Sequence, residues 1–500
     1  MKIAIIGAGL SGSTVLKTIL THPNFKETDQ ISVFDPLGKL GPGFPYAPDD
    51  ETIMLNSPLR HLSVDLSNSN DFINWLESNV GDYINKEGLV SRQRYGQYIE
   101  DYFESYYAHP QVTHVRDVIT DMDVLNAGSH YRLKTSDTWL EDTYDAVFFA
   151  IGHQPYNDFY NLIGTKNYIH NPYPASKYLS QFQSEQKIGI IGSGTTSIDM
   201  MRYFTERYDL KHPLTYYERD KAFYFPDIPY EKGDLTFTLS KEWIEKEKAT
   251  HNGYVPFDVI LKTITADIAS EGVQIEQVYE KYKLDDFETK IRAVEENDQE
   301  LALVQRYISQ LGHLLPDLFN AMSEADRDYY LKHYFHKLLF FRSRVPNKSF
   351  KKLASLYQSG DIRVVFGLSD ITVQKDGTFL ISAKENETAD VLVNATGFTS
   401  NLEKAAEQDE LIKNLFQKEL IMPHKDGQFI HVDWPESHVI TKPFGLLNHV
   451  FWLGSYVRGV QHENNDAKLI IQQAVLTAKS MMDKRVRNNN DDKKTLVKQQ

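Results

Sequence analysis

Apolar residues in the first 35 positions form two short continuous runs with a helical repeat between them. The runs 2–6 and 31–34 are almost wholly apolar, as in strands that are buried on both faces. Between them, Val15, Leu16, Ile19 and Leu20 recur at helical spacing. The pattern predicts a strand, a helix and a second strand, which together form a βαβ unit.

A glycine-rich turn, Gly7-Ala8-Gly9-Leu10-Ser11-Gly12, joins the first strand to the helix, and Asp35 follows the second strand. In a dinucleotide-binding unit the first glycine permits the tight turn, the second lets main chain approach the pyrophosphate, and the third lets helix pack on strand. The helix N-terminus then faces the phosphates, and the acid accepts from ribose hydroxyls. We therefore predict a dinucleotide site at Gly7, Gly9, Leu10, Ser11, Gly12 and Asp35.

A second copy of the pattern begins at residue 187. An apolar run, 187–191, precedes Gly192-Ser193-Gly194-Thr195-Thr196-Ser197, which leads into a helical stretch. Ser197 replaces the third glycine, and a residue this small still allows close packing. We predict a second nucleotide site at Gly192, Gly194, Thr195 and Thr196.

The strand after this helix, 214–217, ends at Glu218 and Arg219. An acid at this point favours a ribose with a free 2′-hydroxyl, whereas Arg219 and Lys221 suit a 2′-phosphate. Arg219 is therefore a candidate cofactor contact, and the residues leave NADH and NADPH both open.

Each glycine turn is followed by short alternating strands and by a strand that ends in glycine. The first series lies at 112–118, 122–125, 131–134 and 146–150 and leads to Gly152; the second lies at 362–366, 371–374, 379–383 and 391–394 and leads to Gly397. The fold class is predicted to be α/β, with two Rossmann-like domains of the glutathione reductase type, small β-meanders and a helical insertion. Two such domains present two nucleotides to each other, as hydride transfer requires.

Composition and charge exclude some classes of partner. The 500 residues carry a net charge of −15, which argues against nucleic acid and anionic membranes as partners. The apolar run after Met1-Lys2 is too short for a signal peptide, and no run is long enough to span a membrane. We expect a soluble cytoplasmic protein that acts on a small molecule.

The chain has no cysteine, which excludes thiolate nucleophiles, CxxC relays, disulfides and cysteine-ligated metal. No histidine has metal-ligand spacing, and no metal is expected. Redox chemistry would then come from an organic cofactor.

In this order, the landmarks resemble a family of bacterial FAD/NAD(P)-binding proteins that is itself similar to flavin-dependent N-hydroxylating monooxygenases. The resemblance covers residues 1 to 480 and includes both glycine turns. Its other segments are Gly41-Pro42-Gly43-Phe44-Pro45-Tyr46, Leu55-Asn56-Ser57-Pro58, Arg92-Gln93-Arg94-Tyr95-Gly96-Gln97-Tyr98, Asn394-Ala395-Thr396-Gly397-Phe398 and Leu453-Gly454-Ser455-Tyr456-Val457-Arg458-Gly459.

The resemblance implies FAD on the first turn and NADPH or NADH on the second, with a slight preference for NADPH. It places Gly41 and Gly43 against the flavin or its pyrophosphate, Asn56 near the isoalloxazine ring, and Gly454 and Ser455 over the ribityl chain. A helix that starts near Asn465 would point its N-terminus at the flavin.

The order of the landmarks also predicts domain limits. We expect an FAD-binding domain at 1–180 with a helical insertion at 46–110, an NAD(P)-binding domain at 184–350 with a helical insertion at 235–350, a return to the FAD-binding domain at 351–482, and a disordered tail at 483–500.

Together these features predict an FAD-dependent, NAD(P)H-using oxidoreductase. The resemblance favours a monooxygenase that acts on an amine- or sulfur-containing substrate through a flavin C4a-hydroperoxide. Two alternatives stay open: a reductase or oxidase without oxygen insertion, and a non-catalytic nucleotide-binding module. The sequence identifies no catalytic acid or base.

Overall fold

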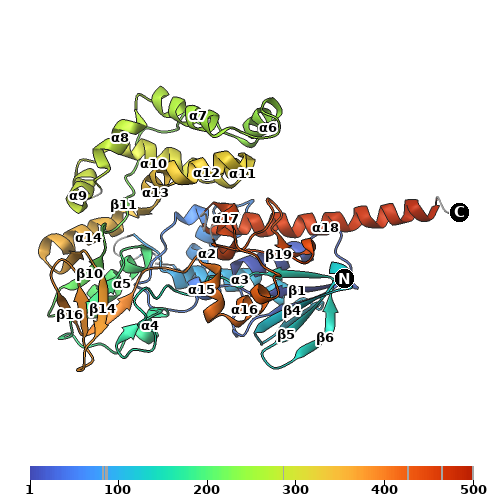
Figure 1. Ribbon diagram of the computed structural model, residues 1–500, viewed down its shortest axis with the longest axis horizontal. Helices are drawn as coiled ribbons and strands as arrows, with labels where there is room; N and C mark the ends of the chain where they lie inside the picture. The colour runs from blue at the N-terminus through green and yellow to red at the C-terminus, as the bar shows by residue number, and fades with distance from the viewer. Residues whose placement is uncertain (82–83, 85–87, 285, 425–426, 463–465, 498–500) are drawn as a thin grey trace. The chain divides into compact units, whose positions relative to one another are not determined.

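The computed structural model describes residues 1–81, 84, 88–284, 286–424, 427–462 and 466–497, with side chains as far as Arg485 (Figure 1). The chain forms two compact units, and neither is continuous in sequence. The first unit comprises Met1–Pro48, Ser57–Pro155 and Phe398–Gln500, and the second comprises Asp49–Asn56 and Tyr156–Gly397.

A six-stranded sheet is the frame of the first unit. Its strand order is β18-β19-β7-β1-β2-β3, and all neighbours are parallel except β18 with β19. The strands are β1 (Lys2–Ile6), β2 (Gln30–Phe34), β3 (Val112–Val115), β7 (Ala146–Phe149), β18 (His438–Thr441) and β19 (Gly445–Trp452). The strand, helix and strand predicted at the N-terminus are β1, α1 (Leu10–Leu20) and β2.

Both faces of this sheet are covered, which explains why its central strands are continuous apolar runs. Ile3 and Ile5 pack with α1 and α18 (Ala467–Val497) on one face, whereas Ala4 and Ile6 face the other. The second face is covered by the meander of β4 (Ile119–Leu125), β5 (His130–Thr135) and β6 (Trp139–Tyr144), and by α15 (Leu402–Gln408) and α16 (Glu410–Gln417). Helices α2 (Asp71–Asn79) and α3 (Arg92–Tyr107) fill the predicted insertion.

Helix α18, red in Figure 1, continues through the segment for which the sequence predicts a tail. Lys484 lies 2.5 Å from Glu436, and Arg485 lies 2.6 Å from Asp29. These ion pairs anchor the helix beyond residue 483.

A five-stranded parallel sheet is the frame of the second unit. Its order is β13-β10-β9-β17-β8, and its strands are β8 (Tyr168–Ile169), β9 (Ile188–Ile191), β10 (Leu214–Glu218), β13 (Ile362–Phe366) and β17 (Val391–Asn394). One face packs on α4 (Ala175–Tyr178), α5 (Thr195–Arg207) and α14 (Asn347–Ser359). The other packs on the meander of β14 (Asp370–Val373), β15 (Phe379–Ser382) and β16 (Glu387–Ala389).

The position of β13 and β17 differs from the domain limits expected from sequence. The return to the first domain was expected at 351, but β13 pairs with β10 and β17 pairs with β9. Because these strands complete the second sheet, the first unit resumes only at Phe398.

A helical lobe with its own apolar core belongs to the second unit. Its helices are α6 (Lys241–Thr250), α7 (Phe257–Ser270), α8 (Ile275–Tyr282), α9 (Phe287–Glu295), α10 (Gln299–Leu311), α11 (Leu315–Ala321), α12 (Glu324–His333) and α13 (Phe335–Arg342). Two short strands, β11 (Phe225–Pro226) and β12 (Arg344–Val345), bracket the lobe. Asp286, Asp298 and Ser323 cap α9, α10 and α12 through their side chains. Within the described residues, no helix combines the length and apolarity that a membrane crossing needs.

Candidate nucleotide-binding sites

The first glycine turn lies at the carboxyl end of β1, where it leads into α1. Gly7 has φ +98°, and a Cβ there would lie 2.2 Å from the carbonyl oxygen of Ala150. A Cβ on Gly12 would lie 1.9 Å from the carbonyl oxygen of Gly7. Side chains are thus excluded at both positions, as the motif predicts. The side chain of Leu10 is buried, so this residue offers a ligand only its main-chain amide, beside that of Ser11 at the start of α1.

A loop from residue 41 to residue 43 packs directly on this turn. The amide of Gly41 donates to the carbonyl oxygen of Ala8 at 2.7 Å. A Cβ on Gly43, which has φ +61°, would lie 3.0 Å from the Cα of Gly9. The structure therefore brings together five of the predicted glycines, Gly7, Gly9 and Gly12 of the turn and Gly41 and Gly43 of the loop, with little room for side chains between them.

Asp35 fixes the turn from the end of β2. Its Oδ2 accepts the amide of Ala8 at 2.8 Å, and its Oδ1 accepts the amide of Leu37 at 2.8 Å. Each carboxylate oxygen still has acceptor capacity, because it can accept two hydrogen bonds. Asp35 can thus hold the loop and accept from a ribose hydroxyl, which stays a prediction.

Gly152 and Gly454 lie together at the ends of β7 and β19. A Cβ on Gly454 would be 3.7 Å from the carbonyl oxygen of Gly152, and a Cβ on Gly152 would meet nothing within 4 Å. Ser455, whose contact with a cofactor stays a prediction, donates its hydroxyl to Oε1 of Gln154 at 2.7 Å. Nε2 of Gln154 returns a bond to the carbonyl oxygen of Ser455 at 2.9 Å. The side chain of Ser455 therefore joins two strand ends, and Gln154 is a residue that sequence reasoning missed.

His153, also unforeseen, follows Gly152. Its ring packs on Phe398 with centroids 4.6 Å apart. Burial, helped by the charges of Arg458 and Arg92, lowers the pKa of His153 to about 4. The imidazole is therefore neutral at neutral pH. It can stack on an aromatic ring without bringing a positive charge next to Gly152.

An aromatic cluster lies behind the 41–46 loop. The rings of Tyr46 and Tyr95 meet edge to face at 4.7 Å, and burial raises the pKa of Tyr46 to about 12. Tyr95 is fully buried, and its hydroxyl has no hydrogen-bond partner in the described part of the chain. A Cβ on Gly96 would lie 1.9 Å from the carbonyl oxygen of Tyr46. This mid-helix glycine holds the loop against α3, and its place in a helix was the available signal.

The second glycine turn repeats the first at the carboxyl end of β9. Gly192 has φ +95°, and a Cβ there would lie 2.8 Å from the carbonyl oxygen of Ala395. Gly194 precedes α5 as its N-cap residue, with Thr195 exposed and Thr196 half-buried. Ser197 is fully buried, and its hydroxyl donates to the carbonyl oxygen of Gly194 at 2.6 Å. The replacement of the third glycine is thus accommodated by a hydrogen bond.

Glu218 ends β10 beside this turn, and Arg219 follows the strand. Burial raises the pKa of Glu218 to about 6, although a hydrogen bond from Ser193 and the charge of Arg219 oppose that shift. The side chain of Arg219 is exposed, and its carbonyl oxygen accepts the amide of Gly367 at 2.9 Å.

Gly397 lies at the end of β17, where Asn394 organises the main chain. Nδ2 of Asn394 donates to the carbonyl oxygens of Asn157 and His170 at 2.9 and 3.1 Å, and its Oδ1 accepts from Thr396. The amide of Asn157 donates to the carbonyl oxygen of Gly397 at 3.0 Å. These bonds fit a scaffold role for this segment.

Two implied flavin contacts stay predictions. Asn56 is exposed and ends the segment Asp49–Asn56, which belongs to the second unit, whereas the first glycine turn belongs to the first. Asn465 lies outside the described residues, and α18 begins at Ala467.

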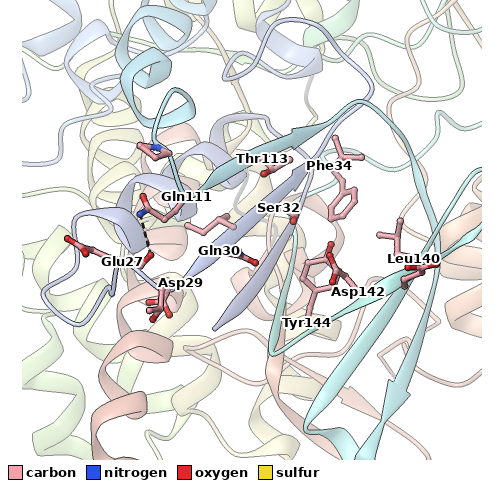
Figure 2. Close-up of a pocket in the computed structure, with 15 residues that line it drawn as sticks. Glu27, Asp29, Gln30, Ser32, Phe34, Gln111, Thr113, Leu140, Asp142 and Tyr144 are labelled. Atoms are coloured by element: carbon pink, nitrogen blue, oxygen red, sulfur yellow. Dashed lines mark hydrogen bonds between the residues drawn. The ribbon is translucent and has the colours of Figure 1, made fainter.

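A groove of about 550 Å³ lies elsewhere in the first unit, along β2, β3 and β6 (Figure 2). Gln30, Ser32 and Phe34 line it from β2, and none of the residues predicted from sequence does. Its Asp29 is bound by the N-terminal ammonium of Met1 at 2.6 Å as well as by Arg485.

Asp433, Glu436 and His438 gather at one point in the first unit. Glu436 accepts from Ser480 and Lys484, while Asp433 accepts from the ring and the amide of His438. A lysine ammonium thus already pairs with Glu436, and the network ties α18 to β18.

Two glycine turns, each between a parallel strand and a helix, define a two-domain dinucleotide-binding fold of the kind predicted from sequence. Residues 4–154 match the model of a family described as FAD-NAD(P)-binding, which confirms the predicted resemblance. No curated protein sequence matches the chain.

Solved structures of flavin-dependent monooxygenases share the fold. Ornithine hydroxylase (PvdA) from Pseudomonas aeruginosa is 16% identical with a TM-score of 0.57, over 96% of this chain and 98% of that one. L-lysine 6-monooxygenase from Pseudomonas syringae is 12% identical with a TM-score of 0.58, over 96% and 98%. Ornithine N-hydroxylase KtzI from Kutzneria sp. 744, solved with reduced FAD, NADP⁺ and L-ornithine, is 12% identical with a TM-score of 0.55, over 97% and 99%.

Proposed function

We propose that the chain is an FAD-dependent, NAD(P)H-using monooxygenase that acts on a small amine- or sulfur-containing substrate. The observation that carries the proposal is the pair of glycine turns, one at the end of β1 and one at the end of β9. Their first glycines meet equivalent carbonyl oxygens, those of Ala150 and Ala395. Two nucleotide cradles in one chain fit a flavin and the coenzyme that reduces it.

The first cradle fits FAD. A dinucleotide pyrophosphate needs close main-chain approach and unpaired amides, and the Gly9–Gly43 contact and the start of α1 offer both. Gly152 and Gly454 add main chain without side chains, and Asp35 holds an acceptor at the end of β2. We place FAD on these residues.

The second cradle fits NADH or NADPH. The start of α5 is open to a ligand at Thr195, and Gly194 has no atom closer than 3.9 Å to the place of a Cβ. Main chain at Gly192 and Gly194 and the amides of Thr195 and Thr196 would bind the pyrophosphate.

Bound FAD would accept a hydride from the coenzyme and use the electrons to activate O₂. The protein would position the two nucleotides and exclude water, while the neutral ring of His153 keeps an extra positive charge out of the flavin cradle. Amine oxygenation is supported by the shared fold with ornithine and lysine hydroxylases. The absence of cysteine fits a reducing compartment, and we place the enzyme in the cytoplasm.

The test starts from the purified full chain. An absorbance spectrum is expected to show bound flavin, and anaerobic addition of NADH or NADPH is expected to bleach it. In air, coenzyme consumption is then compared with hydrogen peroxide release, with and without ornithine, lysine, cadaverine and a thioether. A substrate that raises consumption and lowers the peroxide share supports oxygenation. Complete conversion to peroxide with every nucleophile identifies an oxidase, and a flavin that never bleaches identifies a non-catalytic module.

A further inference from the structure

The carboxylate of Glu218 lies beside the second glycine turn with acceptor capacity to spare. The hydroxyl of Ser193, within the turn, accepts the amide of Phe223 at 2.8 Å, and both this hydroxyl and the main-chain amide of Arg219 act on the Glu218 carboxylate and lower its pKa against the effect of burial. Oε1 of Glu218 is buried and accepts no hydrogen bond from any residue that the structure describes. A buried acceptor without a donor is costly, and a ligand hydroxyl would relieve that cost.

The first turn provides an internal comparison. Asp35 lies after β2 at the position that corresponds to Glu218 at the end of β10. The two carboxylate oxygens of Asp35 accept the amides of Ala8 and Leu37. Ser193 has the position in the second turn that Ala8 has in the first. At the second turn the Ser193 side chain therefore takes the place of the Ala8 amide as the group that connects the turn to the carboxylate. The longer glutamate therefore has one oxygen linked to the turn and one that no amide of the turn holds.

We propose that Glu218 selects the 2′-hydroxyl of the adenosine ribose over a 2′-phosphate, so that the second site takes NADH. This inference rests on the proposed function of that site as the coenzyme site. A carboxylate at the end of this strand receives the ribose hydroxyl of NAD, and a 2′-phosphate would put like charge against it.

The charges around Glu218 do not compensate for an added phosphate. Arg219, Asp220 and Lys221 are exposed and alternate in sign, and exposed Asp370 lies near the same point. With Glu218 and the buried ammonium of Lys290, which also acts on that carboxylate, these six groups sum to zero. Phosphate sites in proteins instead gather an excess of positive charge.

A buried lysine holds the loop that carries these residues. Lys290 of α9 is fully buried, and its ammonium donates to the carbonyl oxygens of Ala222 and Phe223 at 2.8 and 2.6 Å. The loop is thus tied down two residues beyond Asp220. Glu218 is held in place between this anchor and Ser193, as a selecting residue must be.

The experiment measures dissociation constants of NADH and NADPH for the FAD-loaded full chain under anaerobic conditions. The wild type is expected to bind NADH at least about tenfold more tightly. Glu218→Gln keeps the shape but removes the charge, and it is expected to bring the two constants within about threefold. Asp234→Asn removes the same charge from an exposed residue outside this group and is expected to leave the wild-type ratio unchanged. Flavin content confirms that each variant is folded.

The outcomes separate this inference from the proposed function. If the wild type binds NADPH as tightly as NADH, the selection is overturned and the coenzyme site stands. An unchanged ratio in Glu218→Gln overturns the role of this residue. If neither coenzyme binds, the proposed function fails, and the inference fails with it.

Discussion

A Cβ on Gly43 would lie 3.0 Å from the Cα of Gly9, so two main chains from separate loops meet without side chains. Gly43 also has φ +61°, which strains any other residue. We expect Gly43→Ala to weaken FAD binding at least about tenfold, because the loop must leave the turn. Flavin fluorescence titration of the apoprotein measures the affinity for FAD. Gly38→Ala is the control, since a Cβ there meets nothing within 4 Å. Equal affinity in both variants would contradict a tight cradle.

The two turns should respond differently to substitution of the third small residue of the motif, which is Gly12 in the first turn and Ser197 in the second. A Cβ on Gly12 would lie 1.9 Å from the carbonyl oxygen of Gly7, whereas Ser197 is already accommodated. We expect Gly12→Ser to lower the free energy of unfolding by more than about 3 kcal/mol, because the added Cβ would overlap main chain that must then shift. Ser197→Gly should cost only about 1–2 kcal/mol, from one lost hydrogen bond and added chain entropy. Urea unfolding compares them, and similar losses at both sites would refute the difference in packing.

Stability should depend on Glu218 at high pH. Burial raises the pKa of Glu218 from its ordinary value of 4.5 to about 6, so the folded state holds this proton more tightly than the unfolded state. The proton's stabilising effect is complete below pH 4.5 and is lost as the pH rises through 6. Glu218→Gln should therefore be more stable than wild type by about 1–2 kcal/mol at pH 8, and by almost nothing at pH 4.5. Urea unfolding without coenzyme measures this, with Asp220→Asn as the charge control. An equal gain at both pH values would speak against a buried carboxylate.

His153 should contribute to loss of stability in acid. Its pKa is lowered from 6.5 to about 4, so the unfolded state binds the proton first as the pH falls. Stability is therefore lost between pH 6.5 and pH 4, by on the order of 1–3 kcal/mol. His153→Gln should abolish that part of the pH dependence, and His212→Gln, at an exposed histidine, should not. Thermal unfolding across this range is the measurement; parallel curves for His153→Gln and wild type would contradict it.

Local pattern was enough to predict the two βαβ units. The apolar runs became β1, β2, β9 and β10, and the glycine turns lie where helices α1 and α5 begin. Sequence shows these features because strand, turn and helix are neighbours along the chain, and the spacing of the glycines follows from the geometry of that turn.

Long-range partners could not be predicted in the same way. The hydrogen bond between Ser455 and Gln154 joins residues about 300 positions apart in sequence, and nothing near either residue indicates the pair. The end of the second domain was placed too early because β13 and β17 have the pattern of any buried strand. Strand pairing, which pattern does not encode, decides to which sheet they belong.

The strand order of the first sheet also governs when this chain can fold during synthesis. Strand β7 receives its partner β19 only from residues 445–452, and α1 is covered by α18, which is made later still. A ribosome thus releases the N-terminal sheet with an open edge and a bare apolar face, and these persist until almost the whole polypeptide has emerged. Nascent chains stalled before residue 445 should consequently be clients of chaperones, and no truncation that keeps only the N-terminal third will yield a flavin-binding fragment.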